Sequence, residues 1–465
     1  MKAAYRTDVW GNSNFPIHWT WSGTSSSPIT VDVDQTWYNT ASCSGWNRPQ
    51  WTAQGASIGS GCSGGLGANW MLYLDNAEYV VFNWNDMSGL YWADDEQNAC
   101  YQHVGFIIGN ASDHVTVNNP YFHNWTHGTE GGTITDTGSA GMIASYNTTP
   151  SCSHCVVNYM VMDNSDSPDG ASCATSGHAL CSGGGVTNWN VKSSIFTNVV
   201  EALLTRTPSG TSLELGGNYI TNINMSFTTP NQGTSGPHPN CLETLQGGTF
   251  YIHDNFINEA YVCEGGQVGN PGETDYVWNN IWVMSGGSGS NGPQVPQSSP
   301  SGSLYFWNNT LYNTYACINQ AGHGGTYTGD FEVNNNHCIT SSSAAVVGEF
   351  SASGTNSTTN NVVMTPAVAT SQGYTSAETY VYSPTAGTNS TVGAGMNLTS
   401  AWPSGYSSND TGYACTEQTI GGVLQAVCPV RTATNGRTSS WDAGAYQWGG
   451  SSLPLAPTGL SAVVQ

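Results

Sequence analysis

Three glutamates in the centre of the chain could carry out acid–base chemistry. Glu201, Glu243 and Glu264 each stand in a short apolar segment of the kind that forms β-strands. Two carboxyl groups about 5 Å apart suit a retaining glycoside hydrolase, and about 6.5–9.5 Å suits an inverting one. We therefore expect Glu243 and Glu264 to be the acid and the base or nucleophile, with Glu201 as an auxiliary. The competing interpretation is that they are solvated side chains on an outer strand face.

Four polar residues around these glutamates are candidates for binding a substrate. His238 lies between two prolines, which hold it on a stiff loop ahead of Glu243. Arg206, His178 and Gln267 flank the other glutamate segments. We expect these four side chains to position the substrate. A histidine in such a loop can equally serve as a structural hydrogen-bonding group.

An acidic segment of the chain could bind a divalent cation. Asp163, Asp166 and Asp169 stand close together with an asparagine, and Ca²⁺ takes 6–8 oxygen ligands. The spacing is not that of an EF-hand loop, and an Asp-rich turn between two strands would give the same pattern. Ca²⁺ is therefore a candidate ligand, whereas hydrolysis by paired carboxylates requires no cofactor.

The cysteines indicate an oxidising compartment. The chain has 13 Cys, and several form close pairs flanked by Gly and Ser, which is typical of disulfides that close loops. The expected disulfides are Cys43 with Cys62, Cys152 with Cys155, Cys173 with Cys181, and Cys415 with Cys428. A zinc site at Cys152 and Cys155 would need a second pair of ligands, which His178 and Cys181 could supply. The disulfide interpretation is favoured, because other features also indicate secretion.

Glycosylation signals point to the same compartment. Asn-x-Ser/Thr triplets occur at Asn110, Asn124, Asn147, Asn224, Asn308, Asn356, Asn389, Asn397 and Asn409. Many such triplets arise by chance in a chain this rich in Asn, Ser and Thr. They permit glycosylation, and we expect a secreted protein that lies outside the cell or on its surface.

The charge of the chain excludes several partners. Lys and Arg number 7 against 30 Asp and Glu, which gives a formal net charge of −23. Phosphate binding needs clustered Lys and Arg, which argues against nucleic acid and against an anionic membrane surface. No run approaches the roughly 20 apolar residues of a membrane-spanning helix, so we expect no membrane insertion.

The same charge favours a neutral or weakly charged polysaccharide as the partner. A lyase that acts on uronates needs basic residues to neutralise the substrate, and those are scarce here. Sugar rings stack on aromatic faces, and aromatic residues recur in one part of the chain. These residues are Trp278, Trp282, Tyr305, Trp307 and Tyr312, some of which could instead belong to the core.

These residues must be positioned by a repeat that the asparagines reveal. Short alternating strands are followed by a polar corner and a second short strand, and the corner asparagines are Asn218, Asn255, Asn280, Asn309, Asn336 and Asn361. A period of about 25 residues is typical of the coils of a parallel β-helix, in which stacked coils bury their inner faces together. Asn tolerates the left-handed backbone of a corner, and its amide can bond the Asn of the next coil.

On these repeats the sequence resembles the right-handed parallel β-helix proteins of the pectate-lyase-like class. The resemblance covers roughly residues 70 to 450, and the segment Asn435-Gly-Arg437 to Tyr446 resembles the closing motif of many secreted bacterial members. It implies an all-β, single-stranded right-handed solenoid. We expect an N-terminal cap and first coil over 1–70, the β-helix over 71–448, and a Gly/Ser/Pro-rich tail over 449–465.

The most favoured function is that of a glycoside hydrolase acting on a polysaccharide. The resemblance supports several other activities, because this class includes lyases, esterases and surface proteins without catalysis. The first alternative is a non-enzymatic extracellular protein, either a self-assembling surface or filament subunit or a glycan-binding module. The second is a Ca²⁺-dependent polysaccharide lyase with Asp163, Asp166 and Asp169 as metal ligands and Arg206 as base.

Overall fold

The structure is a computed structural model that describes most of the repeats and much of the C-terminal region. The described residues are 17–32, 48, 50–52, 70–88, 91–93, 105–124, 126–128, 141–145, 152, 154–165, 184–199, 201–223, 241–259, 273–284, 293, 302–314, 316–318, 326–327, 329–340, 351–352, 354, 356–377, 380–410, 415–420, 423–427, 435–438 and 440–449. Within them the chain is all-β apart from one short helix, α1 (Pro366–Ser371).

Two long parallel sheets form the body of the molecule. The first has sixteen strands: β1 (Ile17–Trp19), β2 (Ile29–Val31), β4 (Trp70–Asp75), β5 (Glu78–Asn83), β8 (Gly105–Asn110), β9 (Asp113–Asn118), β12 (Gly141–Ser145), β13 (Val156–Asn158), β15 (Gly184–Thr187), β16 (Asn190–Lys192), β18 (Glu201–Gly216), β20 (Leu242–His253), β22 (Thr274–Trp278), β24 (Ser303–Trp307), β27 (Phe331–Asn334) and β30 (Asn356–Ser357). The second has eleven: β3 (Gln50–Thr52), β6 (Asp86–Ser88), β10 (Tyr121–His123), β14 (Val161–Asp163), β17 (Ile195–Thr197), β19 (Tyr219–Thr221), β21 (Phe256–Glu259), β23 (Ile281–Met284), β25 (Thr310–Thr314), β28 (His337–Thr340) and β31 (Val362–Met364).

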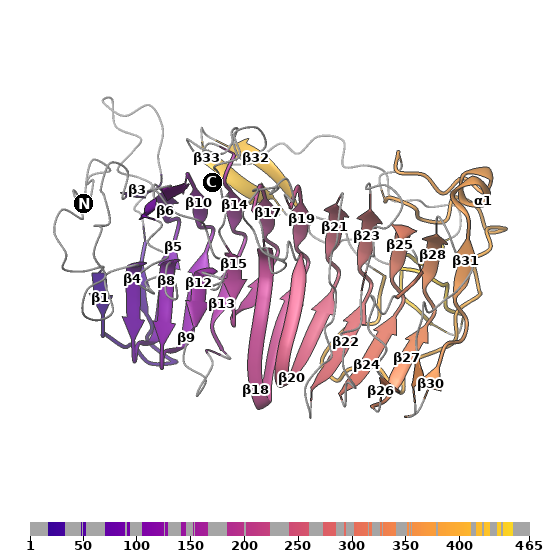
Figure 1. Ribbon diagram of the computed structural model, residues 1–465, viewed down its shortest axis with the longest axis horizontal. Helices are drawn as coiled ribbons and strands as arrows, with labels where there is room; N and C mark the ends of the chain where they lie inside the picture. Colours follow the sequence, from indigo (N-terminus) through magenta and orange to yellow (C-terminus); the bar gives the residue numbers. More distant parts are fainter. Residues whose placement is uncertain are drawn as a thin grey trace.

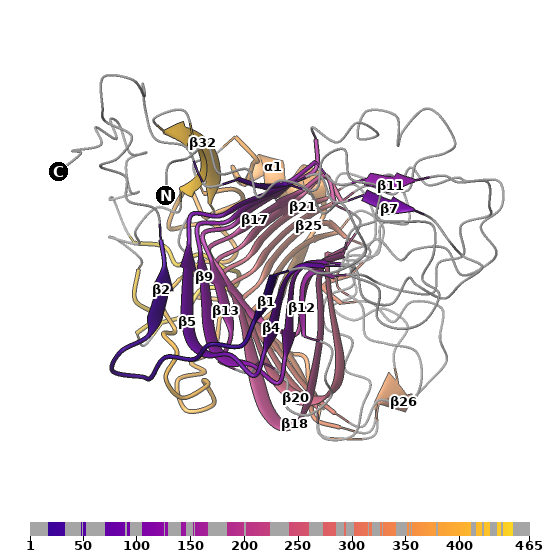
Figure 2. The ribbon, with the colours of Figure 1, turned by 90° about the vertical axis from the view of Figure 1, so that its left-hand side faces the viewer.

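Consecutive strands of the chain alternate between faces, and each strand pairs in parallel with its counterpart in the next repeat. β5 pairs with β9, for example, and β6 pairs with β10. The long strands β18 and β20 pair along two stretches that are separated by register shifts, so they join two faces of the sixteen-stranded sheet. Figures 1 and 2 show the strands side by side along the molecule and around a common interior. This arrangement is solenoid-like and compatible with the β-helix that the repeats predict.

The interior is filled by alternate residues of each strand. In β4 and β5, Leu72, Leu74, Val80 and Phe82 are fully buried while their neighbours face outward. This alternation is what a strand with one buried face requires. One core cluster runs from Leu72 to Cys338 through all the intervening repeats.

The predicted asparagine ladder is present at the corners. Asn218, Asn255, Asn280, Asn309, Asn336 and Asn361 form a chain in which each Nδ2 donates to the Oδ1 of the next member, at 2.9–3.1 Å. Each Oδ1 after the first also accepts the backbone N–H of the preceding ladder residue. The ladder therefore satisfies buried backbone groups that the turn would leave without partners.

The left-handed backbone lies one residue before each ladder asparagine, and not at the ladder residue itself. The positive φ angles belong to Gly217, Asp254, Asn279, Asn308, Asn335 and Asn360. The corner thus uses two residues for two tasks. The first turns the chain, and the second hydrogen-bonds along the stacking direction.

Among the described residues, the last strand of the two parallel sheets is β31, which ends at Met364. Beyond it α1 and the chain after it pack Ala369, Tyr374, Val381 and Tyr382 on the outer face of the eleven-stranded sheet, near β28 and β31. Two later stretches, 393–410 and 435–449, lie against the outside of the repeats, and we call them the C-terminal strap. A hairpin of β32 (Thr416–Ile420) and β33 (Val423–Val427) lies on the eleven-stranded sheet, as Figure 1 shows.

The strap is held by the outer row of corner residues. The Nδ2 groups of Asn279, Asn308, Asn335 and Asn360 donate to backbone carbonyls of the strap, at 2.6–3.0 Å. Gly444 has a φ of +98°, and a side chain there would clash with His337 and Thr310. Only glycine therefore lets this part of the strap approach the corner so closely.

At the other end of the chain, β1, β2 and β3 pair with β4, β5 and β6. Residues 17–52 therefore contribute strands to both sheets. Three short pairs complete the strands: β7 (Tyr91–Ala93) with β11 (Thr126–Gly128), β26 (Thr326–Tyr327) with β29 (Ser351–Ala352), and the β32–β33 hairpin. The tail beyond 449 lies outside the described residues.

One of the four expected disulfides joins two described cysteines, Cys152 and Cys155. A second disulfide, Cys317–Cys338, was not expected because its halves are 21 residues apart in different repeats. Cys241 and Cys415 each take part in a disulfide as well. The expected pairs Cys43–Cys62 and Cys173–Cys181, together with Cys428, lie outside the described residues.

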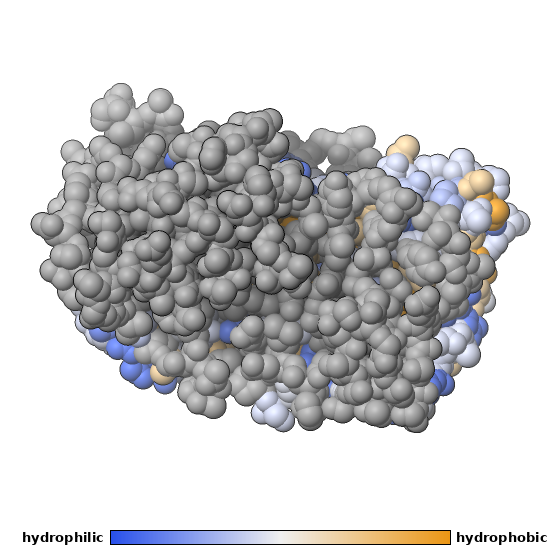
Figure 3. Space-filling model, in the orientation of Figure 1, coloured by the Kyte–Doolittle hydropathy of each residue, from blue (hydrophilic) through white to orange (hydrophobic). Residues whose placement is uncertain are grey.

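The visible described surface is mostly hydrophilic to neutral, with small apolar patches at the α1 end (Figure 3). Val368 of α1 is one of the exposed large apolar side chains there. No helix in the described ranges combines the length and apolar character needed to span a bilayer.

Candidate functional site

Two of the three predicted catalytic glutamates lie on neighbouring strands. The pairing of these strands shows which residue lies opposite each glutamate. Glu201 begins β18 and pairs with Gly184 of β15. Glu243 lies in β20 and pairs with Leu204 of β18, three positions beyond Glu201. The two glutamates are therefore not direct cross-strand partners. Arg206 lies in β18 opposite Leu245.

The other predicted site residues lie outside the described part of the chain. These are Glu264, His178, His238 and Gln267, together with Asp166 and Asp169 of the calcium candidate. Their places in the site remain predictions.

Asp163 of the calcium candidate ends β14 and makes local hydrogen bonds. Its Oδ1 accepts the backbone N–H of Ser165 and the Nδ2 of Asn198, both at 2.8 Å. The first of these bonds is the Asx turn that the structural interpretation expects. Burial and the Asp163 carboxylate together raise the pKa of Glu417, on the β32–β33 hairpin, to about 7.

The predicted sugar-stacking aromatics divide into two groups. The indole rings of Trp278, Trp282 and Trp307 are buried, so these three belong to the packing of the molecule and present no face to a sugar. Tyr305 and Tyr312 are only partly buried. Tyr312 stacks on Tyr382 on the outer face of the eleven-stranded sheet. Tyr305 belongs to a larger arrangement on the sixteen-stranded sheet.

Three half-buried tyrosines form a column on the outer face of that sheet. Register places Tyr251, Tyr276 and Tyr305 directly beside one another on β20, β22 and β24. Their ring centroids are 5.6 and 4.8 Å apart, with interplanar angles of 11° and 14°. We call these residues the tyrosine stripe. The stripe also packs against an aromatic cluster that includes strap residues, and the ring centroids of Tyr251 and Tyr406 are 4.6 Å apart.

A carboxylate stands at each end of the tyrosine stripe. Glu214 of β18 pairs with Tyr251, and Glu332 of β27 pairs with Tyr305. Four strand steps separate the two glutamates, which corresponds to about 19 Å at the usual spacing between strands. The column therefore offers an elongated polar and aromatic surface with an acidic group at each end.

At one end, Glu214 belongs to a compact ionic cluster. Its carboxylate contacts Lys192 Nζ at 2.6 Å and His253 Nε2 at 3.2 Å, and His253 Nδ1 contacts Asp254 at 2.6 Å. Burial opposes ionisation of Glu214, but the bonds from His253 and Lys192 outweigh it and lower its pKa to about 2. Burial likewise disfavours charge on His253, yet Asp254 and Glu214 raise its pKa.

His253 is positioned by its neighbours on three sides. Its ring stacks on Trp278 at 4.6 Å and 8°, and Tyr406 of the strap packs edge-on at 5.3 Å. Gly216 is its register partner, and a side chain there would come within 2.8 Å of the imidazole. The histidine is therefore fixed in one orientation between two carboxylates.

At the other end, two carboxylates are close together. Asp330 directly precedes β27, and Glu332 is the second residue of that strand. Burial and the Asp330 charge raise the pKa of Glu332. Burial and both carboxylates raise the pKa of Tyr305. The three groups therefore lie near enough to influence each other's ionisation.

The Asp330–Glu332 pair has the features of an acid–base couple. The two carboxylates lie near enough for the Asp330 charge to act on Glu332, and glycoside hydrolases use two neighbouring carboxyl groups. The raised pKa of Glu332 favours its protonated form, which is the form that a general acid needs. Sequence reasoning missed this pair. An Asp-x-Glu pattern at the start of an alternating strand was the available signal, because residues two apart share a face.

Two of the predicted glycosylation sites have buried asparagine side chains. Asn308 is fully buried and donates to Asp442 O, and Asn389 is 7% exposed and donates to Gln372 O. Neither amide can carry a glycan in the folded chain. Asn356, Asn397 and Asn409 are exposed. Asn124 is intermediate and Asn110 ends β8, while Asn147 and Asn224 lie outside the described residues.

Comparison with known proteins adds nothing to the site. No protein-family model matches the chain, and no curated protein matches its sequence. Function must therefore be argued from the side chains themselves.

Proposed function

We propose that the chain is an extracellular, carbohydrate-active, right-handed parallel β-helix of the pectate-lyase-like class. The parallel sheets, the Asn ladder and the disulfides support this proposal. Disulfides are stable in oxidising compartments, which favours secretion or display at the cell surface.

The substrate is a neutral or weakly charged polysaccharide that lies along the tyrosine stripe. Tyrosine hydroxyls and ring edges provide hydrogen bonds and apolar contact, which together suit the mixed surface of a sugar. Outward Ser and Thr residues flank the stripe, because Thr249, Thr274 and Ser303 are paired across the same strands. The net charge of −23 opposes binding of a strongly anionic polymer.

The proposed reaction is glycoside hydrolysis, and the Asp330–Glu332 pair carries the proposal. Glu332, with its raised pKa, protonates the oxygen of the leaving sugar. Asp330 removes a proton from the attacking water on the other side of the bond. The glycosidic C–O bond breaks as the water oxygen bonds to the anomeric carbon. The products are two sugar chains, one with a new reducing end.

A second assignment of the catalytic residues stays open beside this one. The glutamates Glu243 and Glu264, with Glu201 as auxiliary, could provide the acid and the base at the β18–β20 strands. His238, Arg206, His178 and Gln267 would then position the substrate. Substitution distinguishes the two assignments.

The test is product release from a panel of neutral and uronate polysaccharides, with and without EDTA. We expect new reducing ends, no absorbance near 235 nm and no effect of EDTA. Glu332→Gln should lower kcat by about 10²–10⁴-fold, since a general acid contributes roughly that much. Glu78→Gln, at an exposed strand position far along the chain, is the matched control and should keep full activity.

Each other outcome identifies a different function. Loss of activity in Glu243→Gln but not in Glu332→Gln would move the active site to β20. Absorbance at 235 nm that EDTA abolishes would favour the Ca²⁺-dependent lyase. Binding of a polysaccharide without any product would favour a glycan-binding module, and fibres without substrate would favour a self-assembling subunit.

A further inference from the structure

Two histidines and one aspartate from neighbouring repeats converge at an outer corner of the molecule. Asp113 and His114 begin β9, and His154 lies just before β13 in the next repeat. Asp113 Oδ2 is 2.9 Å from His154 Nδ1 and 3.2 Å from His114 Nδ1. One potential metal ligand atom from each of the three residues lies within 4.8 Å of the others. This corner is far along the chain from the tyrosine stripe.

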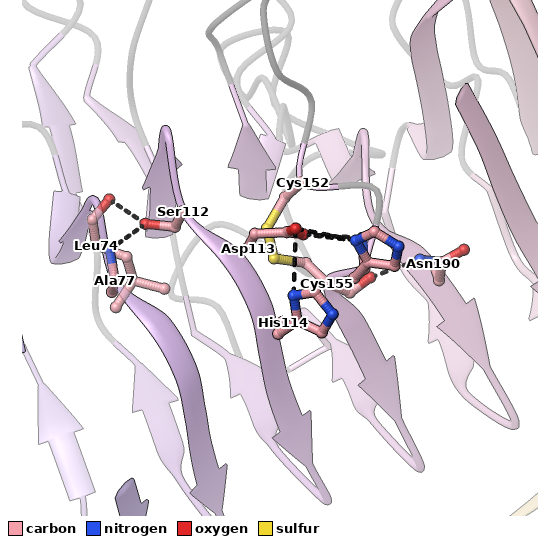
Figure 4. The surroundings of a disulfide bond; sticks show 9 residues. Leu74, Ala77, Ser112, Asp113, His114, Cys152, Cys155 and Asn190 are labelled. Carbon is pink, nitrogen blue, oxygen red and sulfur yellow. Dashed lines mark hydrogen bonds and ion pairs between the residues drawn. A yellow bond between two sulfur atoms is a disulfide. The ribbon is translucent and has the colours of Figure 1, made fainter. Parts of the chain in front are cut away.

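A disulfide positions one of the two histidines. His154 lies inside the short loop that the Cys152–Cys155 disulfide closes, and Cys155 N–H donates to Cys152 O at 2.9 Å within it. Figure 4 shows this disulfide beside Asp113, with His114 below the carboxylate. Both sulfurs are covalently bonded, so the cysteines cannot act as thiolate ligands. The alternative in which Cys152 and Cys155 ligate zinc is therefore wrong, because both sulfurs belong to the disulfide.

The carboxylate is oriented toward both imidazoles. Its second oxygen, Oδ1, accepts the backbone N–H of His154 at 3.2 Å. A carboxylate whose second oxygen is held by a hydrogen bond is the usual setting of a metal-ligating Asp.

The donor distances resemble those within a metal's coordination shell. Four ligands at about 2.0 Å in a tetrahedral Zn²⁺ site lie about 3.3 Å from one another. The two measured N–O distances, 2.9 and 3.2 Å, are close to that separation. The side chains are 31–60% exposed, so an ion can enter and a water or substrate atom can complete the shell.

We propose that Asp113, His114 and His154 form a binding site for one divalent transition-metal ion. Two imidazole nitrogens and one carboxylate oxygen suit Zn²⁺ and Cu²⁺ better than Ca²⁺ or Mg²⁺, which prefer oxygen ligands. The site has three protein ligands and leaves a coordination position open.

Metal binding requires one ring to turn. The two imidazoles now stack at 4.3 Å and 15°, and Tyr79 stacks on the other face of His114 at 4.5 Å. A metal lies near the plane of each imidazole that binds it, so two nearly parallel rings cannot both face one ion. His154 is the more exposed ring, at 60%, and is the one that rotates.

Calorimetric titration of Zn²⁺ into the untagged, EDTA-treated full chain tests the site. We expect one ion whose affinity falls at least about ten-fold in His114→Asn and in His154→Asn. His18→Asn is the matched control, because His18 and Asp75 form a similarly exposed pair at 3.1 Å on β1 and β4. That variant should bind as the wild type does. Wild-type binding in both site variants, or none in the wild type, would overturn the proposal.

A spectroscopic measurement on the wild type tests the ligands directly, so it does not depend on whether the variants fold. The electron paramagnetic resonance spectrum of one equivalent of Cu²⁺ should show coupling to two imidazole nitrogens. The His154→Asn spectrum should show only one. A wild-type spectrum without nitrogen coupling, or one that His154→Asn leaves unchanged, would refute the assignment.

Discussion

At the scale of single residues, the histidine beside the tyrosine stripe is a strongly constrained titrating group. His253 is 14% exposed and lies between the carboxylates of Glu214 and Asp254. Its neighbours Gly216 and Trp278 leave it one orientation. Such a cluster can anchor the strap through Tyr406, and it also sets the charge at one end of the proposed binding surface.

The stability that Glu214 and His253 contribute depends on pH, and the sign of this dependence follows from two opposite pKa shifts. The pKa of Glu214 falls from 4.5 to about 2, so its contribution is present above about pH 4.5 and is lost as the pH falls further. The pKa of His253 lies above 6.5, so its contribution is complete below that value and is lost as the pH rises through the folded pKa. The pair therefore stabilises the fold most between about pH 4.5 and 6.5.

We expect His253→Gln to lower the free energy of unfolding by about 2 kcal/mol near pH 6, the usual value of a hydrogen bond to a charged group, and by less at the two extremes. Urea unfolding at several pH values measures this. His18→Gln, at an exposed position, is the control and should change little. An effect of His253→Gln that is the same at every pH would show that the ring acts by packing alone.

The proposed role of Glu332 as general acid predicts how the reaction rate depends on pH. A general acid must be protonated, so activity should fall as the pH rises through the raised pKa of Glu332. Initial rates should therefore decline on the alkaline side of the pH range, and Glu332→Gln should abolish that decline. A rate that rises steadily above neutral pH would argue against Glu332 as the acid.

At the scale of the elements, the asparagine ladder ties the repeats together. Asn280 donates to Asn309 Oδ1 and to Ile252 O, and it accepts both the N–H and the Nδ2 of Asn255. Removing this side chain leaves buried groups in neighbouring repeats without partners. Unsatisfied buried polar groups cost about 1–3 kcal/mol each.

We therefore expect Asn280→Ala to destabilise the chain by about 3 kcal/mol or more, measured by urea unfolding. Asn356→Ala, at an exposed strand position, should cost less than about 0.5 kcal/mol. Equal costs for the two variants would mean that the ladder bonds contribute no more than surface asparagines do.

At the scale of the whole molecule, the C-terminal strap joins the corners of four successive repeats. Arg437 is buried, and its guanidinium donates to Asn279 Oδ1 and to the carbonyls of Gly444 and Ala445 at 3.0 Å. Burial lowers its pKa to about 10, against the opposing charges of Asp410 and Asp442. The closing motif of the sequence is thus the point at which the strap is fixed to a repeat corner.

Replacing Arg437 should release the strap while the repeats stay folded. Lys cannot reproduce the forked geometry of the guanidinium, so Arg437→Lys should speed proteolytic cleavage within 393–449 several-fold. Mass spectrometry of the fragments locates the cuts. Thr399→Ala, at an exposed strap position, serves as control. Cleavage spread equally over the strand repeats would indicate general unfolding instead.

The all-β, repeated character of this protein was determined by local sequence. Strand alternation and recurring asparagines act within and between adjacent repeats, so their spacing predicted the ladder from Asn218 to Asn361. The Cys152–Cys155 disulfide was likewise predictable from the sequence, because the two cysteines are only three positions apart. The left-handed residue was misplaced by one position, since periodicity does not tell the turning residue from the hydrogen-bonding one.

Tertiary structure alone decided which side chains share a site. A parallel stack places residues 25 to 40 positions apart side by side, and a register error of one residue moves a side chain to the opposite face. The stripe from Glu214 to Glu332 and the meeting of Asp113 with His154 both depend on that register. The return of the strap over the repeat corners depends on contacts more than 100 residues apart, which no local pattern encodes.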